Sequence, residues 1–520
     1  MPFRLPEKKA PGTYRIFVLG SSAAMGDPEP SFSLARMLET LLRAAYPEKH
    51  FEVINAGITA INSHLLRVYA EDCARLEPDL FIVYEGHNEV IGPFGPSGVF
   101  APFLRSPAAI RFAVWMKGTR TAQLLGSAAR ALAGERGAPA DWGGMQMFLR
   151  QQIAADDPRL EAVREQFRQN LTAIADAAAR AGASALFCTV LTNDRDFAPF
   201  QSRHRADLPA SELTRWQTHF EAGGRALREG DLTTAESAWR EALAIDDRHA
   251  ELVFRLGRLA LQAGRDAEAR TFLRRARDLD TLRFRTDSRL NDVVRTLDVD
   301  VRRAAVVDLS AALARRSSHG VAGDDLLYEH VHLNFRGTYE AARVLFASVT
   351  ADLARRDFAA SPAPQPIDYE QARLRLAYSA HEQAMIALAL LGRFRSAPFT
   401  AQSDNTARID LWTRRADAAQ ALLGRPEVLP VLRRIYDDAL RAAPDDWVLA
   451  RNAGAMLVAR QSPGDAVPLL QRALAWIDDD LDTLLALGWA QRALGRVHEA
   501  DTAFNRVREL EPRYPGLPEK

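Results

Sequence analysis

Small residues recur at intervals of 34 positions in this chain, and this spacing constrains the fold more than any other feature. Gly223 and Gly257 are separated by one interval, and so are Ala235 and Ala269. Small side chains at fixed offsets let two antiparallel helices approach closely, while a bulky residue such as Trp239 fills the groove between them. The period therefore predicts stacked pairs of helices, each covering apolar surface that its neighbour leaves exposed.

This pattern resembles the tetratricopeptide repeat, a family whose arrays bind peptides or carrier proteins. Gly454 and Gly488 show the same spacing near the C-terminus, as do Ala466 and Ala500. We expect two repeats at roughly 216–249 and 250–283, and three more at roughly 413–446, 447–480 and 481–514. The resemblance implies a protein or carrier partner.

A different pattern begins near the N-terminus, where an apolar, β-prone run over 14–19 ends at Gly20 and two serines, Ser21 and Ser22. In open α/β sheets, ligands and catalytic groups lie at the carboxyl ends of the strands. Ser31 is expected to cap a following helix over 32–46. Further buried strands are predicted at 51–54, 79–84, 184–191 and 304–309.

Other strand ends and one loop carry the partners that a nucleophilic serine needs. Glu329 precedes His332 by three residues. At this spacing a carboxylate can orient one imidazole nitrogen while the other nitrogen faces a serine. The amide of Asn88 and the backbone N–H of Gly57 could donate to a developing oxyanion. The spacing predicts a nucleophile–base–acid arrangement at one edge of the sheet.

Together these blocks resemble the SGNH hydrolases, the GDSL-type esterase and acyltransferase superfamily. The matching residues are Gly20, Ser21, Ser22 and Gly26 for G-D-S-x-x-x-G, Gly57 for the second block, Gly86, His87, Asn88 and Glu89 for G-x-N-D, and Glu329 and His332 for D-x-x-H. The resemblance implies a three-layer, flavodoxin-like α/β domain with a parallel sheet and no cofactor. It also implies that Ser22 is the nucleophile, with an oxyanion hole formed by Ser22, Gly57 and Asn88.

The sequence departs from the family pattern where Ser21, Glu89 and Glu329 stand in place of aspartates. Glutamate can still orient an imidazole. The resemblance implies attack on an ester or thioester through an acyl-Ser22 intermediate, and it leaves hydrolysis and O-acyl transfer open. The alternative is a catalytically silent tetratricopeptide scaffold that binds proteins.

The repeats divide the hydrolase-like part of the chain. We expect four segments: 1–198 and 284–360 form the α/β domain, 199–283 is an inserted pair of repeats, and 361–520 is a C-terminal helical repeat domain. Because the insert leaves from the catalytic edge, we expect it to contact the C-terminal repeats around 447–510 and to form a wall beside Ser22.

A few other polar residues are candidates for contact with substrate. His87 lies between the two motif residues Gly86 and Asn88, Asn193 follows a strand, and Arg285 precedes the return to the α/β domain. Each has a plainer interpretation as a variable position, a loop residue or a solvated helix residue. His330 is expected to face away from His332. No zinc motif is present, so no metal is expected.

Composition narrows the remaining choices. The 67 basic and 67 acidic residues balance, so a nucleic-acid partner is not expected. Cys73 and Cys188 are expected to be buried thiols. Residues 105–133 mix apolar and basic side chains, which fits either membrane-surface contact or a cover helix. The chain shows neither a spanning segment nor a signal peptide, so we expect a cytoplasmic protein. The alternative is a membrane-anchored or periplasmic protein with a longer N-terminus.

Overall fold

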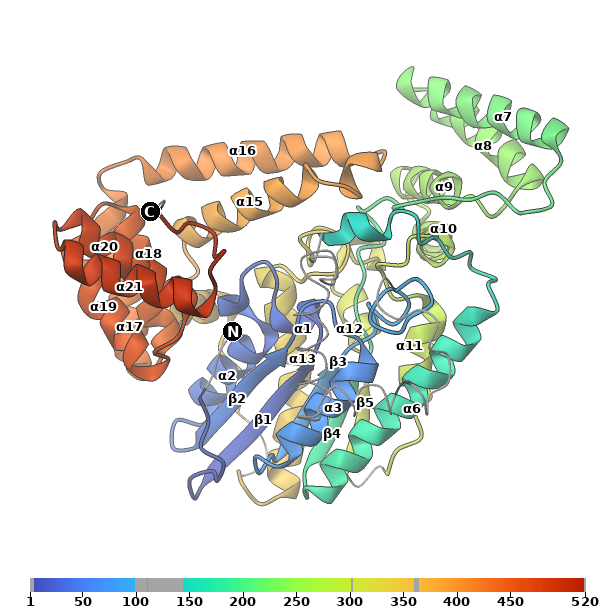
Figure 1. The fold of residues 1–520 in the computed structure, drawn as a ribbon. Helices are drawn as coiled ribbons and strands as arrows, with labels where there is room; N and C mark the ends of the chain where they lie inside the picture. Colours follow the sequence, from blue (N-terminus) through green and yellow to red (C-terminus); the bar gives the residue numbers. More distant parts are fainter. Residues whose placement is uncertain (1–3, 99–109, 111–143, 301–302, 360–363, 519–520) are drawn as a thin grey trace, which may run out of the picture.

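A five-stranded parallel sheet forms the centre of the protein (Figure 1). The structure, a computed structural model, describes residues 4–98, 110, 144–300, 303–359 and 364–518. The strands are β1 (Thr13–Gly20), β2 (His50–Gly57), β3 (Leu80–Tyr84), β4 (Ser184–Cys188) and β5 (Ala304–Val307), in the order β2-β1-β3-β4-β5. All five predicted strands are present. Gly20 pairs with Gly57 on one side and Tyr84 on the other, which brings three strand ends to one edge.

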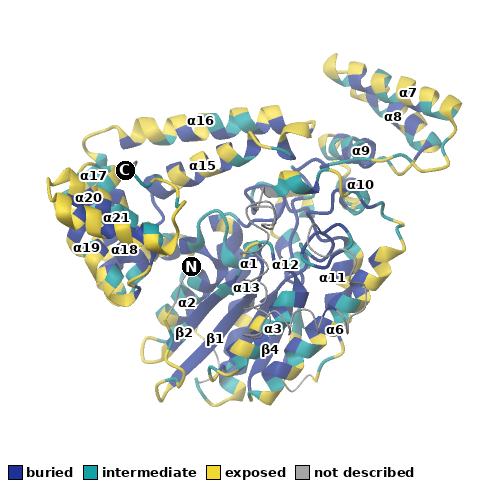
Figure 2. Ribbon diagram, viewed as in Figure 1, coloured by how far each residue is buried: buried dark blue, intermediate teal, exposed yellow. Residues whose placement is uncertain are grey.

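Helices cover both faces of this sheet, as a three-layer α/β fold requires. One face packs against α2 (Leu34–Ala45), α12 (Leu309–Ala314) and α13 (Phe335–Arg355). The other packs against α3 (Ser63–Ala74), α6 (Arg159–Arg180) and α11 (Ser288–Arg295). Successive strand residues point to opposite faces, so Ile16 and Val18 join the first layer and Phe17 and Leu19 the second. The central strands β1, β3 and β4 are buried along their whole length, whereas the edge strands β2 and β5 are partly exposed (Figure 2).

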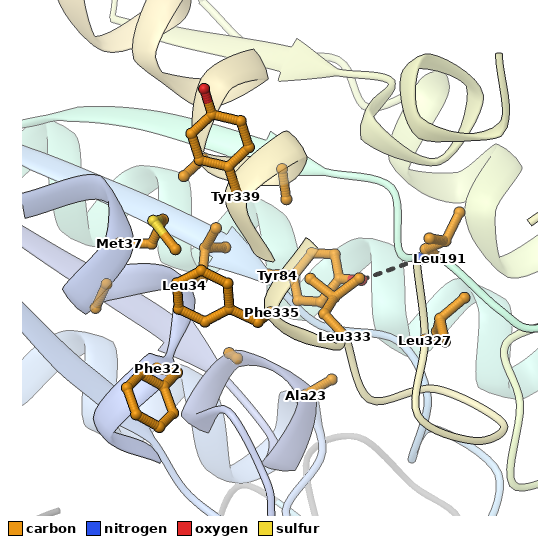
Figure 3. Packing of buried hydrophobic residues seen from close by; sticks show 14 of the residues in the cluster. Ala23, Phe32, Leu34, Met37, Tyr84, Leu191, Leu327, Leu333, Phe335 and Tyr339 are labelled. Atoms are coloured by element: carbon orange, nitrogen blue, oxygen red, sulfur yellow. Dashed lines mark hydrogen bonds between the residues drawn. The ribbon is translucent and has the colours of Figure 1, made fainter. Parts of the chain in front are cut away.

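Aromatic rings fill the first layer close to the carboxyl edge (Figure 3). Phe335, at the start of α13, stacks on Tyr378 with ring centroids 4.1 Å apart, and Phe32 meets Tyr378 edge-on. The Tyr84 hydroxyl accepts a hydrogen bond of 3.1 Å from the Leu191 N–H, fixing the chain just beyond β4. Burying each large ring stabilises the fold by about 1.5–3 kcal/mol. The loops at the carboxyl edge of the sheet are therefore supported by a layer of packed aromatic rings.

The helices near the serines begin at other residues than expected. A short helix, α1 (Ser22–Met25), follows β1 directly, and a 3-10 turn covers Pro30–Phe32. The predicted cap at Ser31 is wrong: α2 starts after the extended residue Ser33, whose hydroxyl accepts from the Arg36 N–H. The Ser31 hydroxyl instead accepts a hydrogen bond from Arg451.

The inserted segment consists of two helical hairpins. They are formed by α7 (Ala210–Arg228) with α8 (Leu232–Ile245), and by α9 (Ala250–Gln262) with α10 (Asp266–Leu279). A Cβ added to Gly223 would lie 2.4 Å from the Trp239 ring, and one added to Gly257 would lie 2.7 Å from Leu273. The expected role of the small residues in close helix approach is confirmed.

The C-terminal region is entirely helical over its described residues. Its helices are α14 (Tyr369–Arg375), α15 (Ala380–Phe394), α16 (Asn405–Leu423), α17 (Val428–Ala442), α18 (Trp447–Ala459), α19 (Pro463–Trp476), α20 (Leu481–Ala493) and α21 (Val497–Leu510). The hairpins α18–α19 and α20–α21 match the predicted repeats. Gly454 packs on Leu470 and Gly488 on Phe504, as the spacing requires.

The predicted repeat at 413–446 is wrong. Its two helices do not form a hairpin, because α16 pairs with α15 while α17 packs on α14 and α18. The apolar side of α17 explains this choice, since Leu432 and Tyr436 are buried in a cluster with Ala377 and Ala384. The Tyr436 hydroxyl also donates to the buried carboxylate of Glu382.

The expected contact between the insert and the repeats around 447–510 is also wrong. The C-terminal repeats dock beside α2, where Arg36 pairs with Asp446 at 2.6 Å and Arg451 reaches Ser31 at 2.7 Å. In Figure 1 these repeats lie on the left and the hairpin α7–α8 at the upper right. Polar side chains on α2 and on the turn before it bind the C-terminal repeats, and these repeats therefore dock on the α/β domain instead of on the insert.

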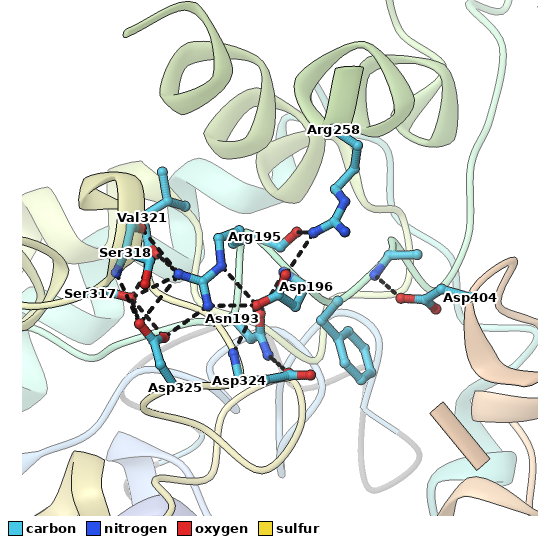
Figure 4. A network of polar contacts seen from close by, with 12 residues as sticks. Asn193, Arg195, Asp196, Arg258, Ser317, Ser318, Val321, Asp324, Asp325 and Asp404 are labelled. Atoms are coloured by element: carbon cyan, nitrogen blue, oxygen red, sulfur yellow. Dashed lines mark hydrogen bonds and ion pairs between the residues drawn. The ribbon is translucent and has the colours of Figure 1, made fainter. Parts of the chain in front are cut away.

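The insert meets the C-terminal region elsewhere, through the loop that follows β4 (Figure 4). Asp196 in this loop accepts a hydrogen bond of 2.6 Å from Arg258 of α9. Arg195 reaches back to Asp325 of the α/β domain at 3.1 Å, and the Ala198 N–H donates to Asp404 at 3.2 Å. The loop thereby connects the insert, the α/β domain and the C-terminal helices.

No helix among the described ranges combines the length and apolar character needed to cross a membrane. The candidate membrane-contact segment 105–133 lies, apart from the buried Ile110, outside the described residues.

Candidate active site

A chain of hydrogen bonds joins Ser22, His332 and Glu329 at the carboxyl edge of the sheet. Ser22 Oγ lies 2.9 Å from His332 Nε2, within the distance of about 4 Å expected for such a pair. His332 Nδ1 is hydrogen-bonded to Glu329 Oε1 on the opposite side of the ring. The carboxyl of Glu329 is fully buried. The three side chains thus have the relation of nucleophile, base and orienting acid.

Local backbone geometry holds the acid and the base in this relation. Ser22 starts α1 immediately after β1, so its side chain stands at the strand end. The loop before α13 folds back on itself, with the Tyr328 N–H donating to the His332 carbonyl at 2.8 Å. Glu329 also accepts hydrogen bonds from the backbone N–H groups of His330 and His332. These backbone donors hold the Glu329 carboxylate in the orientation in which it contacts the His332 imidazole.

Two charged residues that the sequence analysis did not single out complete the surroundings of His332. Asp27 Oδ2 lies 3.4 Å from His332 Nε2. Arg393, in the last turn of α15, donates to Asp27 at 2.6 Å and approaches Glu329 Oε1 at 3.7 Å. Arg393 belongs to the C-terminal region, and nothing in its local sequence distinguishes it from other helix-end arginines.

Burial dominates the acid–base properties of His332. It lowers the pKa of the imidazole to about 4, an effect that Asp27 opposes and Arg393 reinforces. The ring is therefore neutral near pH 7, as a general base must be.

Ser22 lines a cavity of about 210 Å³. Its polar lining comes from Ser22, Asp27, Thr59, His87, Asn88, His330, His332 and Arg393, and its apolar lining from Ala60, Ile91, Gly92, Met145, Phe148, Phe284 and Val331. None of these described lining residues belongs to 199–283, so the expected wall formed by the insert is wrong. Phe284 and the end of α15 occupy that side instead.

The two predicted oxyanion donors, Asn88 and the Gly57 N–H, already have different hydrogen-bond acceptors within the protein. Asn88 lines the cavity, and its Nδ2 donates one hydrogen to the Ile61 carbonyl at 2.8 Å. The Gly57 N–H donates to the side chain of Asn55 at 3.1 Å. The expectation for Gly57 is therefore corrected. Its N–H already donates a hydrogen bond to the side-chain oxygen of Asn55.

The residues that depart from the family pattern have structural partners. Glu89 accepts from both the N–H and the hydroxyl of Ser63, so it caps the start of α3. Glu85 is buried next to Ser21, where burial and the neighbouring Glu89 raise the pKa of its carboxyl far above the ordinary value. Hydrogen bonds from Gly86 and Ser21 oppose this rise. A buried carboxyl thus lies beside Ser21, where the family carries an aspartate.

Two of the candidate substrate contacts do not line the cavity. Arg285 is buried and donates to the carbonyls of Asn193 and Phe197 while pairing with Asp280. Asn193 is fully buried and bonds Asp324. Both predictions are corrected, because these side chains satisfy buried backbone and carboxylate groups.

The two neighbouring histidines do line the cavity. The expectation that His330 faces away is wrong: Phe197, Phe284 and Phe399 surround its ring and hold it at the cavity edge. His87 is buried and also lines the cavity, and its contact with substrate stays a prediction.

Among the described side chains, no three His, Cys, Asp or Glu residues are grouped closely enough to hold a metal ion. Cys73 and Cys188 are both buried free thiols, as predicted.

Comparison with known proteins identifies the repeats. Tetratricopeptide-repeat family models match residues 226–283 and 482–513. These ranges fall on α8–α10 with the end of α7, and on α20–α21. The chain therefore contains tetratricopeptide repeats in both helical regions. No curated protein matches the sequence.

Solved structures of repeat proteins also align with parts of the chain. A thermophilic tetratricopeptide-repeat protein of Thermus thermophilus is 14% identical, covering 58% of this chain and 94% of that one, with a TM-score of 0.17. Yeast Tom70 is 12% identical, covering 68% and 69%, with a TM-score of 0.18. The TPR2AB domain of yeast Sti1, solved with pHSP90, is 12% identical, covering 57% and 91%, with a TM-score of 0.15. At these scores the alignments carry no argument about fold or function.

Proposed function

We propose that the α/β domain is a serine hydrolase or acyltransferase of the SGNH type, with Ser22 as nucleophile. The observation that carries this proposal is the hydrogen-bond chain from Ser22 through His332 to Glu329 at the floor of a cavity. A neutral, buried imidazole hydrogen-bonded to both a hydroxyl and a carboxylate is suited to take the serine proton.

The proposed reaction proceeds in two steps. Ser22 Oγ forms a bond to the acyl carbon of an ester or thioester, and its proton passes to His332 Nε2. The tetrahedral intermediate then expels the alcohol or thiol, which receives that proton, and leaves acyl-Ser22. Water or another hydroxyl attacks this ester by the same route in reverse. The second hydrogen of the Asn88 amide and the Ser22 N–H, at the start of α1, are the proposed oxyanion donors.

Cavity size and lining suggest a small substrate. A space of about 210 Å³ with an apolar wall that includes Phe148 and Phe284 suits a short acyl group better than a long lipid chain. Hydrolysis and transfer use the same residues, and only the second nucleophile distinguishes them.

The decisive experiment is labelling of the full chain with a fluorophosphonate probe, with Ser22→Ala as the matched control. We expect labelling of the wild type and none of the variant. Ser21→Ala serves as a second control, because it removes the neighbouring hydroxyl but leaves the proposed nucleophile. Labelling that survives in Ser22→Ala, or a folded wild type that neither reacts nor cleaves short 4-nitrophenyl esters, would contradict the proposal.

The second candidate is a protein-binding scaffold in which the α/β domain is silent. The family matches favour it more directly than the hydrolase, because both lie in repeats and neither lies in the α/β domain. Under this function a partner protein binds Ser22→Ala as tightly as the wild type, and no ester is turned over. Measured affinities of one partner for both proteins, alongside the labelling assay, separate the two functions.

A further inference from the structure

His87 carries a hydrogen-bond donor for which no described residue serves as acceptor. The Thr286 N–H donates to His87 Nδ1 at 3.4 Å, and Thr286 Oγ1 lies 3.1 Å from the same nitrogen. A backbone N–H can only donate, so Nδ1 is the unprotonated nitrogen and the ring hydrogen is on Nε2. Burial, with His332 and Arg277 nearby, lowers the pKa of His87 to about 3, so the ring is neutral.

This Nε2–H is buried and has no hydrogen-bond partner among the described residues. Only 4% of the His87 surface is exposed. Leaving a buried donor unsatisfied costs about 1–3 kcal/mol, so such groups call for an explanation. His87 also lines the cavity that contains Ser22 and His332, where a substrate binds under the proposed function.

His87 and Asn88 both line this cavity but have different hydrogen-bond partners. Asn88 donates to the carbonyl of Ile61, which follows β2, whereas His87 Nδ1 is bound to Thr286 and the ring lies near His332. Phe284, two residues before Thr286, lines the cavity and meets Phe148 edge-on at 5.7 Å. The N–H of His87, which has no partner among the described residues, therefore belongs to a residue that lines the cavity together with apolar side chains such as Phe148 and Phe284.

We propose that His87 selects substrates that carry a hydrogen-bond acceptor oxygen outside the reacting carbonyl. This inference rests on the proposed function of Ser22. A site that hydrogen-bonds one substrate atom discriminates strongly against an analogue lacking it, because the buried partner is then left unpaired. The oxygen belongs either to the acyl group or to the alcohol, and both sources present the same acceptor to Nε2.

Pairs of esters that differ by one oxygen in place of a methylene test this proposal. The acyl arm compares 4-nitrophenyl methoxyacetate with 4-nitrophenyl butyrate, and the alcohol arm compares 2-methoxyethyl acetate with butyl acetate. Each is measured with the full-length wild type and with His87→Leu. Dividing the wild-type ratio by the variant ratio within each pair removes differences in intrinsic ester reactivity.

In one arm we expect His87→Leu to reduce the preference for the oxygen-bearing ester over the methylene ester, measured as the ratio of their kcat/KM values, by about tenfold or more. His87→Gln, which retains a side-chain N–H, should restore part of the preference. The thermal unfolding of His87→Gln should stay near wild type, because its amide oxygen can still accept from the Thr286 N–H.

If His87→Leu loses kcat/KM equally for both esters of both pairs, or loses none, the proposed role of His87 is wrong. The proposed role of Ser22 is unaffected by that result. A wild type without Ser22-dependent turnover overturns the proposed function and this inference together. If His87→Leu does not fold, the same comparison is made with His87→Gln and His87→Asn.

Discussion

Arg393 of α15 forms an ion pair with Asp27 of the nucleophile turn, with 2.6 Å between Arg393 Nη2 and Asp27 Oδ2. Through this contact a helix of the C-terminal region reaches the surroundings of His332. The helical region is thus part of the candidate active site as well as a repeat array.

The first prediction concerns the acid limb of the pH profile. Because only neutral His332 accepts a proton, kcat/KM should rise with pH through about 4, the pKa to which burial lowers this group. Arg393 contributes to that lowering, so Arg393→Met should move the limb upward by about one pH unit. Arg393→Lys keeps the charge and should move it less. An acid limb that stays fixed in Arg393→Met contradicts the assigned influence.

Asn88→Ala tests the oxyanion donor. We expect kcat for short 4-nitrophenyl esters to fall by about 100- to 1000-fold, the loss typical of removing one such donor, with KM little changed. Asn55→Ala is the companion variant, because it releases the Gly57 N–H from its side-chain acceptor. Unchanged turnover in Asn88→Ala would show that this amide only binds the Ile61 carbonyl and does not stabilise an oxyanion.

Gly223 and Gly224 provide a matched pair in one helix of the insert. A Cβ at Gly223 would lie 2.4 Å from the Trp239 ring, whereas the nearest atoms to a Cβ at Gly224 are 3.7 Å away. Gly223→Ala should therefore destabilise the fold by about 1–3 kcal/mol through overpacking. Gly224→Ala should be neutral or stabilising by up to about 1 kcal/mol, since alanine favours helix. Urea unfolding of both variants measures the difference, and equal effects would argue against tight packing at Gly223.

Glu85 should make stability depend on pH in an unusual direction. Its carboxyl has a raised pKa when folded, so the folded state keeps a proton that the unfolded chain loses above about pH 4.3. Stability from this group is present below that pH and declines as the pH rises toward the folded pKa. Glu85→Gln should flatten the decline by up to about 1.4 kcal/mol per pH unit. Unfolding free energies between pH 5 and 8 check this, and parallel curves for both proteins would refute it.

Sequence patterns anticipated the features that depend on neighbouring residues. Strand ends and motif spacing predicted a serine near a histidine because each block specifies its own turn, and parallel strands bring the turns to one edge. The 34-residue spacing predicted the contact of Gly223 with Trp239 for a similar reason, since both lie within one hairpin.

Features that depend on which elements dock together were missed. The repeat expected at 413–446 failed because spacing cannot show that α16 pairs with α15 while α17 packs on α14 and α18. Arg285 looked like a ligand-binding charge, yet it satisfies carbonyls in a buried loop. Arg393 is 366 positions from Asp27, and only the docking of α15 brings the two residues together.

That separation has a consequence for synthesis of the protein. The nucleophile turn leaves the ribosome early, whereas α15 follows more than three hundred residues later. At about 5–20 residues per second, the nascent chain carries Ser22 for tens of seconds before Arg393 can pair with Asp27. The order of translation thus delays completion of the charged rim of the cavity until the C-terminal helices have emerged.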